Sequence, residues 1–156
     1  MKRILFVCLG NICRSPLAEG LFNKALRERG LIDEFEVDSC GTNGLHNGES
    51  PDIRTRNNAR SHGLILEHKS RQITSHDFAD YDHLYVMDEN NLRTVQQLCP
   101  AEYRFKIEKI RDFDPLQAGA DVEDPWYGGD EGFEITYQTL SRCTQALADA
   151  HASNRG

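Results

Sequence analysis

The sequence of 156 residues is long enough to bury a hydrophobic core without disulfide bonds or metal ions. Its balance of 38% hydrophobic and 28% charged residues is typical of a globular protein, and we expect a single domain over residues 1–156. The formal net charge of -7, from 18 basic and 25 acidic side chains, argues against binding to nucleic acid through its phosphates. No apolar run is long enough to span a membrane, so we expect no membrane partner either.

The N-terminus and the cysteines favour a cytoplasmic protein. The apolar stretch after Lys2 and Arg3 is shorter than the roughly 7 residues that an export signal requires. The cysteines are odd in number and irregularly spaced, which is typical of a reduced protein and not of a disulfide framework. They are Cys8, Cys13, Cys40, Cys99 and Cys143.

Hydrophobic periodicity and turn residues divide the chain into alternating strands and helices. A buried strand is predicted over residues 3–7, and a helix over residues 16–29 that Gly30 ends. The apolar stripe of this helix consists of Leu17, Leu21, Phe22, Ala25 and Leu26. The other predicted elements, in chain order, are a strand at 35–38, a loop at 39–48, a helix from Ser50-Pro51 to 61, a short helix or turn at 73–78, a strand at 82–87, a helix at 89–98, a strand at 105–110, a loop at 112–130 and a helix at 132–150.

This order of elements predicts an α/β fold. Strands that alternate with helices form parallel βαβ units with right-handed crossovers. In such sheets the functional site lies beyond the carboxyl ends of the strands. The loop that leaves the first strand is therefore in the right place for a site, and the long loop at 112–130 is of the kind that tends to be functional.

The segment after the first strand has the properties of an anion-binding loop. Backbone N–H groups of such a loop, together with the helix that follows, attract one anion. The same field favours the thiolate of Cys8, which makes it a nucleophile, and Arg14 offers a planar guanidinium for two phosphate oxygens. A cysteine alone at a strand end is more often an inert buried residue, so this interpretation depends on Arg14 and Ser15 at their spacing.

The string Cys8-Leu9-Gly10-Asn11-Ile12-Cys13-Arg14-Ser15, with Asp124-Pro125-Trp126-Tyr127 far downstream, resembles the low-molecular-weight protein tyrosine phosphatases. The resemblance implies a three-layer α/β sandwich with an N-terminal phosphate-binding loop, in which helices flank four parallel strands in the order 2-1-3-4. It implies a hydrolase of phosphotyrosine proteins or peptides and small aryl phosphates, without cofactor or metal. Inorganic phosphate and other oxyanions would inhibit it, and it would be a monomer or a weak dimer.

The resemblance also assigns roles to the residues that carry the chemistry. Cys8 forms a phosphocysteine, Arg14 clamps the phosphate, and Asp124 protonates the phenolate and then activates water. Only the Pro-Trp-Tyr context distinguishes Asp124 from the many acids of its loop. The residues expected around the phosphate are Leu9, Gly10, Asn11, Ile12, Cys13 and Ser15.

Several residues are expected to support the loop. Asn11 matches a residue that braces the loop in a left-handed conformation, which asparagine tolerates, and Ser39 matches its hydrogen-bonding partner. Generic turn and strand-end roles stay open for both. Ser15 either caps the following helix or donates its hydroxyl to the thiolate. The expected scaffold residues with structural hydrogen bonds are His62, His68 and Asp88.

Other residues are expected at the walls of the site. Trp126 and Tyr127 either line the cleft and stack on a phenyl ring or anchor their loop. Leu45 stands where many relatives carry an aromatic wall residue, which is a departure from the family pattern. Cys13 either forms a reversible disulfide with Cys8, as in relatives, or packs behind the loop.

Three alternatives to phosphotyrosine hydrolysis stay open at this point. Arsenate reductases of the same scaffold need two further cysteines, yet residues 85–99 offer only Cys99. Phosphoarginine hydrolases carry a threonine where this chain has Ile12. A phosphate-binding module without catalysis would be expected to lack the nucleophile or the acid, and both are present.

Overall fold

The computed structural model describes residues 1–153, apart from the side chain of Tyr127. Its four parallel strands are β1 (Lys2–Cys8), β2 (Phe35–Gly41), β3 (His83–Val86) and β4 (Ile107–Lys109), in the order β2-β1-β3-β4. The helices are α1 (Arg14–Glu28), α2 (Ile53–Ser61), α3 (Ser75–Asp80), α4 (Glu89–Leu98) and α5 (Gly129–Ser153). Short 3-10 turns are η1 (Ile32–Glu34), η2 (Ala101–Lys106), η3 (Ile110–Phe113) and η4 (Pro125–Tyr127).

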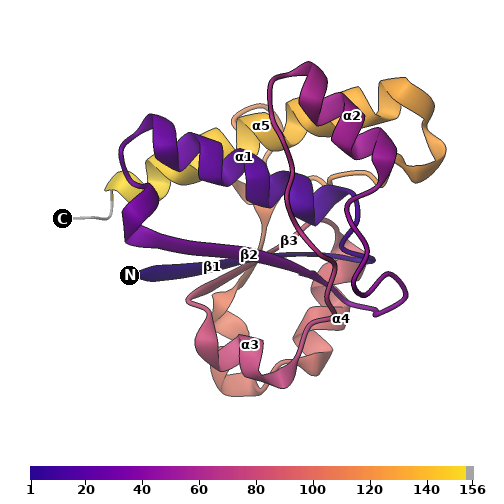
Figure 1. Ribbon diagram of the computed structural model, residues 1–156. Helices are drawn as coiled ribbons and strands as arrows, with labels where there is room; N and C mark the ends of the chain where they lie inside the picture. The colour runs from indigo at the N-terminus through magenta and orange to yellow at the C-terminus, as the bar shows by residue number, and fades with distance from the viewer. Residues whose placement is uncertain (154–156) are drawn as a thin grey trace.

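Helices cover both faces of the sheet, which confirms the predicted α/β sandwich and strand order. In Figure 1, α1, α2 and α5 lie on one side of the strands and α3 and α4 on the other. Because successive residues of a strand face opposite ways, β1 contributes to two cores. Ile4 and Phe6 pack with residues of α1 and α5, whereas Leu5 and Val7 pack with residues of β3, α3 and α4. Among residues 1–153, no helix has the length and apolarity needed to cross a membrane.

The sheet register places the end of β1 next to the end of β2, where Cys8 pairs with Gly41. The predicted loop at 39–48 is therefore wrong for its first three residues, because Ser39 and Cys40 pair with β1 as a continuation of β2. Tertiary pairing overrides the turn tendency of this segment. Gly41 is needed there, since a Cβ atom at this position would lie 2.8 Å from the carbonyl oxygen of Leu9.

Most helix and strand predictions hold in kind, but their ends differ. Helix α1 begins at Arg14 with Cys13 as N-cap, two residues before the predicted start. Helix α2 begins at Ile53, because the Asp52 carboxylate accepts a hydrogen bond from Arg54 N at 2.8 Å and caps it. The predicted helix at 89–98 agrees with α4. The bounds of the other predicted elements differ from the observed ones by a few residues. Strands β3 and β4 are shorter than predicted, helix α3 starts two residues later, and helix α5 is longer at both ends.

Candidate active site

The loop between β1 and α1 wraps around the sulfur of Cys8. Asn11 has φ of 58°, the left-handed conformation expected for it, and its backbone N–H donates to Cys8 Sγ at 3.3 Å. The neighbouring strand holds the outer side of the loop, because Thr42 N donates to the carbonyl oxygen of Cys8 at 2.9 Å. Cys8 itself is only 3% exposed and lies at the bottom of the loop. The loop therefore has the geometry of a cradle with a sulfur atom at its base.

The side chain of Asn11 is fully buried and holds the loop from behind. Its Nδ2 donates to Ser15 Oγ at 2.8 Å and to Ser39 Oγ at 3.0 Å. Its Oδ1 accepts from Arg71 N at 3.1 Å and lies 2.7 Å from His68 Nε2. Both the amide and the carbonyl of Asn11 are thus satisfied, which fixes an unusual backbone conformation in one orientation.

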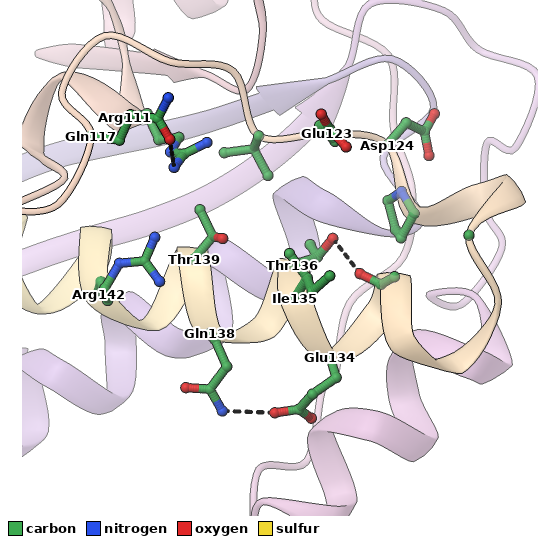
Figure 2. A pocket seen from close by; sticks show the side chains of 14 residues that line it. Arg111, Gln117, Glu123, Asp124, Glu134, Ile135, Thr136, Gln138, Thr139 and Arg142 are labelled. Carbon is green, nitrogen blue, oxygen red and sulfur yellow. Dashed lines mark hydrogen bonds between the residues drawn. The ribbon is translucent and has the colours of Figure 1, made fainter.

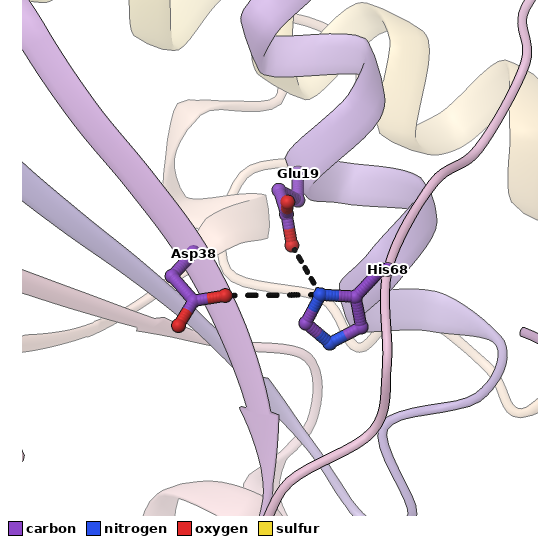
Figure 3. A group of neighbouring side chains, drawn as sticks. All are labelled: Glu19, Asp38 and His68. Atoms are coloured by element: carbon purple, nitrogen blue, oxygen red, sulfur yellow. Dashed lines mark ion pairs between the residues drawn. The ribbon is translucent and has the colours of Figure 1, made fainter. Parts of the chain in front are cut away.

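Behind Asn11, His68 lies between two carboxylates that come from different elements (Figure 3). Its Nδ1 is 3.2 Å from Glu19 Oε1 on α1 and 3.7 Å from Asp38 Oδ1 on β2. Burial raises the pKa of Glu19 to about 7 and lowers the pKa of His68. The three side chains offer metal-type donor atoms within 4.8 Å of one another, but Ser39 already donates to Glu19 and Arg71 to Asp38. The arrangement is a partly buried polar network that orients His68 toward Asn11.

Ser15 lies inside α1 and makes no capping hydrogen bond, so the capping interpretation is wrong. Its hydroxyl oxygen lies 3.0 Å from Cys8 Sγ and accepts from Asn11 Nδ2 at 2.8 Å. The hydroxyl proton can be directed to the sulfur or to the carbonyl oxygen of Cys40, 3.4 Å away, so the second role expected for Ser15 stays a prediction.

Arg14 is buried next to the sulfur and is held by acceptors on its far side. Its Nη1 donates to Asp88 Oδ2 at 2.7 Å and to the carbonyl oxygen of Val122 at 2.9 Å. Its Nη2 lies 3.9 Å from Asp124 Oδ2. Burial alone would lower the pKa of Arg14, but the charges of Cys8, Asp88 and Asp124 outweigh it and raise that pKa. The guanidinium is therefore a fixed positive charge at the side of the cradle.

These residues open into a cleft of about 260 Å³. Asp124 lies at its rim with a side chain that is 46% exposed, and its Oδ1 accepts from Trp126 N at 3.0 Å at the start of η4. Trp126 lines the cleft, as does Leu45, which is 82% exposed. The side chain of Tyr127 lies outside the described residues, so the wall role predicted for it stays a prediction. The cleft is lined by Cys8, Leu9, Gly10, Ile12, Cys13, Arg14, Asn43, Leu45, His46, Asp124 and Trp126.

Cys13 lines the cleft and packs against Ile12 and Phe133. Its thiol is free and buried, and burial raises its pKa to about 12. The alternative that it packs behind the loop, away from the cleft, is therefore not what the structure shows. The disulfide that relatives form stays a prediction for this chain.

Three residues at or next to the cleft were missed in the sequence: Asn43, which lines it, His46 and Arg54. His46 faces Trp126 across the cleft with ring centres 6.4 Å apart, and its Nδ1 lies 2.9 Å from Glu49 Oε2. Arg54 donates to the carbonyl oxygen of Trp126 at 3.1 Å and lies over the rings of Trp126 and Phe133. The spacing of His46 and Glu49 was a weak signal for an ion pair, but nothing local connects Arg54 with a segment 70 residues away.

A larger cleft of about 530 Å³ lies on the other side of the segment that carries Asp124. Figure 2 shows it between this segment and α5, with Arg111 and Arg142 at one end and Asp124 at the other. Both arginines pair with the buried carboxylate of Asp114, at 2.9 and 3.1 Å. Neither Cys8 nor Arg14 lines this cleft, so it is separate from the loop that surrounds the Cys8 sulfur.

Comparison with known proteins agrees with this geometry. The chain matches the family model described as low molecular weight phosphotyrosine protein phosphatase over residues 3–155. A human relative with the same description is 43% identical over 157 residues, and the match covers 96% of each chain. The crystal structure of a protein tyrosine phosphatase from Entamoeba histolytica, with Hepes in its active site, superposes with a TM-score of 0.96 at 35% identity and covers 100% of both chains.

A more distant similarity concerns another phosphoryl substrate. The structure of YwlE, an arginine phosphatase, has a TM-score of 0.88 to this chain at 26% identity, covering 98% of this chain and 97% of the other. The human relative is considerably closer in sequence. The match of the family model over nearly the whole chain decides the assignment, and it confirms the resemblance seen in the sequence: the chain belongs to the low-molecular-weight phosphotyrosine protein phosphatases, a family of cysteine-dependent hydrolases.

Proposed function

We propose that this protein hydrolyses phosphotyrosine in proteins or peptides through a phosphocysteine intermediate. The observation that supports this most is the convergence of Cys8 Sγ, the Arg14 guanidinium and the Asp124 carboxylate on one cleft. Cytoplasmic localisation is part of the proposal and is supported by the free cysteines.

In the first step the thiolate of Cys8 attacks phosphorus, so that an S–P bond forms as the bond to the phenol oxygen breaks. Arg14 and the loop N–H groups hold the phosphate oxygens, where charge is spread in the transition state. The Ser15 hydroxyl, 3.0 Å from the sulfur, stabilises the thiolate by hydrogen bonding. Asp124 protonates the leaving phenolate from the rim of the cleft.

In the second step the Asp124 carboxylate takes a proton from water as the water oxygen attacks phosphorus. The S–P bond breaks, inorganic phosphate leaves and the thiolate is restored. Asp124 is suited to both steps because it is half exposed, close to Arg14, and oriented by the Trp126 N–H. Trp126 and His46 both line the cleft beside the phenyl ring.

The nucleophile is tested with para-nitrophenyl phosphate and with a phosphotyrosine peptide. We expect wild-type protein to release phosphate from both and Cys8→Ser to release none, with Cys143→Ser as the control that keeps full turnover. Trapping of phosphate on Cys8 in rapidly quenched reactions should identify the intermediate by mass. Turnover by Cys8→Ser equal to wild type would refute the proposal.

The proposed role of Asp124 as proton donor is tested by varying the leaving group of the substrate. Because a good leaving group departs without a proton, Asp124→Asn should slow aryl phosphates of high phenol pKa by about 100-fold or more and those of low phenol pKa far less. The measurement is kcat across a series of substituted phenyl phosphates. Equal slowing across the series would remove Asp124 from the role of proton donor.

The arginine phosphatase similarity defines the competing substrate. Ile12 lies at the wall of the cleft and is apolar, which favours an aromatic ring over a guanidinium. We therefore expect a higher kcat/KM for a phosphotyrosine peptide than for the matched phosphoarginine peptide. The reverse ranking would replace the proposed substrate while leaving the phosphocysteine chemistry intact.

A further inference from the structure

A second groove continues from the catalytic cleft past His46 and Trp126. It has a volume of about 540 Å³ and shares Ile12, His46 and Trp126 with the cleft. Its wall is tied to the catalytic loop, because Asp52 N donates to the carbonyl oxygen of Ile12 at 2.8 Å. The groove therefore lies directly beside the cleft, and a peptide whose phosphotyrosine enters the cleft can place neighbouring residues over the groove.

The two acidic residues of this groove already have partners. The carboxylate of Glu49 lies 2.9 Å from His46 Nδ1. The carboxylate of Asp52 caps α2 and lies 3.2 Å from Arg54 Nε, with a side chain that is only 11% exposed. Neither carboxylate forms an ion pair with Arg56 or Lys69, the two cations that line the groove.

The other two charged residues of the groove are cations whose partners are neutral oxygens. Arg56 Nε donates to the carbonyl oxygen of Pro51 at 2.9 Å, and Lys69 Nζ donates to Ser50 Oγ at 2.9 Å. Among the side chains that the structure describes, no carboxylate forms an ion pair with either one. Glu49 and Asp52 balance these two cations in number but form no ion pair with them, so in a protein of net charge -7 Arg56 and Lys69 are free to bind an acidic group.

We propose that this groove binds acidic residues next to the phosphotyrosine of the substrate, with Arg56 and Lys69 as the groups that select them. The inference rests on the proposed phosphotyrosine hydrolysis. An extended peptide advances roughly 3.3 Å per residue, so side chains within a few positions of the phosphotyrosine lie over the groove when the ring is in the cleft. Carboxylates supply the charge that the two cations lack, and such complementarity acts mainly on substrate capture.

The test uses peptides with one phosphotyrosine flanked on both sides by Glu, by Gln or by Lys. Wild-type protein should prefer the Glu peptide to the Gln peptide in kcat/KM, and this preference should shrink as salt is raised. Arg56→Gln and Lys69→Gln should each lower kcat/KM for the Glu peptide by about two- to fivefold, and the double variant by about tenfold. Turnover of the Gln peptide and of para-nitrophenyl phosphate should stay at the wild-type rate.

Arg60→Gln is the matched control, because Arg60 is an exposed arginine of the same helix that does not line the groove. It should leave the preference for the Glu peptide unchanged. Lys69→Glu gives a second test, since reversing the charge should shift the preference toward the Lys peptide. A structural defect would lower turnover of every peptide and could not raise kcat/KM for the Lys peptide.

Two results would overturn the inference: no preference of wild-type protein for the Glu peptide, or equal losses by the double variant on the Glu and Gln peptides. Failure of the proposed function has a different signature, namely no turnover of para-nitrophenyl phosphate or of any phosphotyrosine peptide by wild-type protein.

Discussion

At the scale of single residues, Asn11 connects the scaffold to the chemistry. Its left-handed backbone turns its own N–H toward Cys8 Sγ, while its buried side chain bonds to Ser15 and Ser39. An alanine tolerates this conformation less well, and its side chain cannot make the hydrogen bonds to Ser15 and Ser39. The shape of the anion cradle thus depends on one amide side chain that touches no part of the substrate.

We expect Asn11→Ala to lower kcat/KM for para-nitrophenyl phosphate by about 100-fold, because small displacements of catalytic groups carry costs of this order. Binding of inorganic phosphate, measured as competitive inhibition, should weaken in the same variant. Ser39→Ala, which removes one of the bonds to Asn11, should show the same changes to a smaller degree. Wild-type kcat/KM in a folded Asn11→Ala protein would contradict a positioning role.

The residues that carry the proposed chemistry were accessible to sequence reasoning because they lie in two short motifs. Cys8 and Arg14 are fixed by their spacing and Asp124 by its Pro-Trp-Tyr context. The groups behind them were less accessible, since Glu19 and Asp38 meet His68 only after α1, β2 and a loop have been assembled. Ser15 shows the limit in another way: its capping tendency was a sound local expectation, and tertiary contact with Cys8 decided otherwise.

At the scale of elements, the position of Asp124 depends on a short 3-10 turn, η4, with little hydrogen bonding of its own. Arg54 on α2 holds this turn from outside through the carbonyl oxygen of Trp126 and through stacking on Trp126 and Phe133. Asp52 in turn orients the Arg54 guanidinium at 3.2 Å. Asp124, the proposed proton donor, is thus held between two helices, α2 and α5, neither of which carries it.

We expect Arg54→Lys to lower kcat for aryl phosphates of high phenol pKa by about tenfold, because an ammonium group cannot stack flat on two rings and hold the turn. Substrates with good leaving groups should lose far less, since they do not need the proton. The melting temperature should change little, and Arg60→Lys on the same helix serves as the control. A uniform loss across the leaving-group series would place the effect outside Asp124.

The ends of the elements show why local signals did not suffice. The prediction ended β2 at residue 38, because Ser-Cys-Gly-Thr-Asn-Gly is a turn-like string, yet pairing with β1 extends the strand through Gly41. Ser50-Pro51 predicted a helix start at Pro51, but the N-cap of α2 is Asp52 and the helix begins at Ile53. By contrast, the apolar stripe of α1 was predicted correctly, because its periodicity spans several turns.

At the scale of the whole molecule, the C-terminal end of α5 packs against strands β1 and β3 through His151. His151 is 6% exposed, with Nε2 3.0 Å from the hydroxyl of Tyr85 on β3 and Nδ1 3.4 Å from Lys2 Nζ on β1. Burial first, and then the nearby His83 and Lys2, lower the pKa of His151 to about 4. The folded protein therefore keeps this ring neutral over a pH range in which the unfolded chain takes up a proton.

The sign of the resulting pH dependence follows from this difference. An unfolded histidine binds its proton near pH 6.5, whereas His151 in the folded protein binds one only near pH 4. The stability contributed by the neutral ring is thus fully present above pH 6.5 and is lost as the pH falls toward 4, by about 2 to 3 kcal/mol in the free energy of unfolding.

We expect this decline between pH 7 and 4.5 to appear as the difference in urea unfolding between wild-type protein and His151→Gln, because glutamine keeps a polar group near Tyr85 but takes up no proton. Glu19, whose raised pKa makes its own contribution grow as the pH falls, is common to both proteins and cancels in this difference. The pKa of His83 is also lowered by burial, so His83→Gln measures the other histidine contribution in the same range. Parallel pH profiles for wild-type protein and His151→Gln would show that the ring at the end of α5 does not couple protonation to folding.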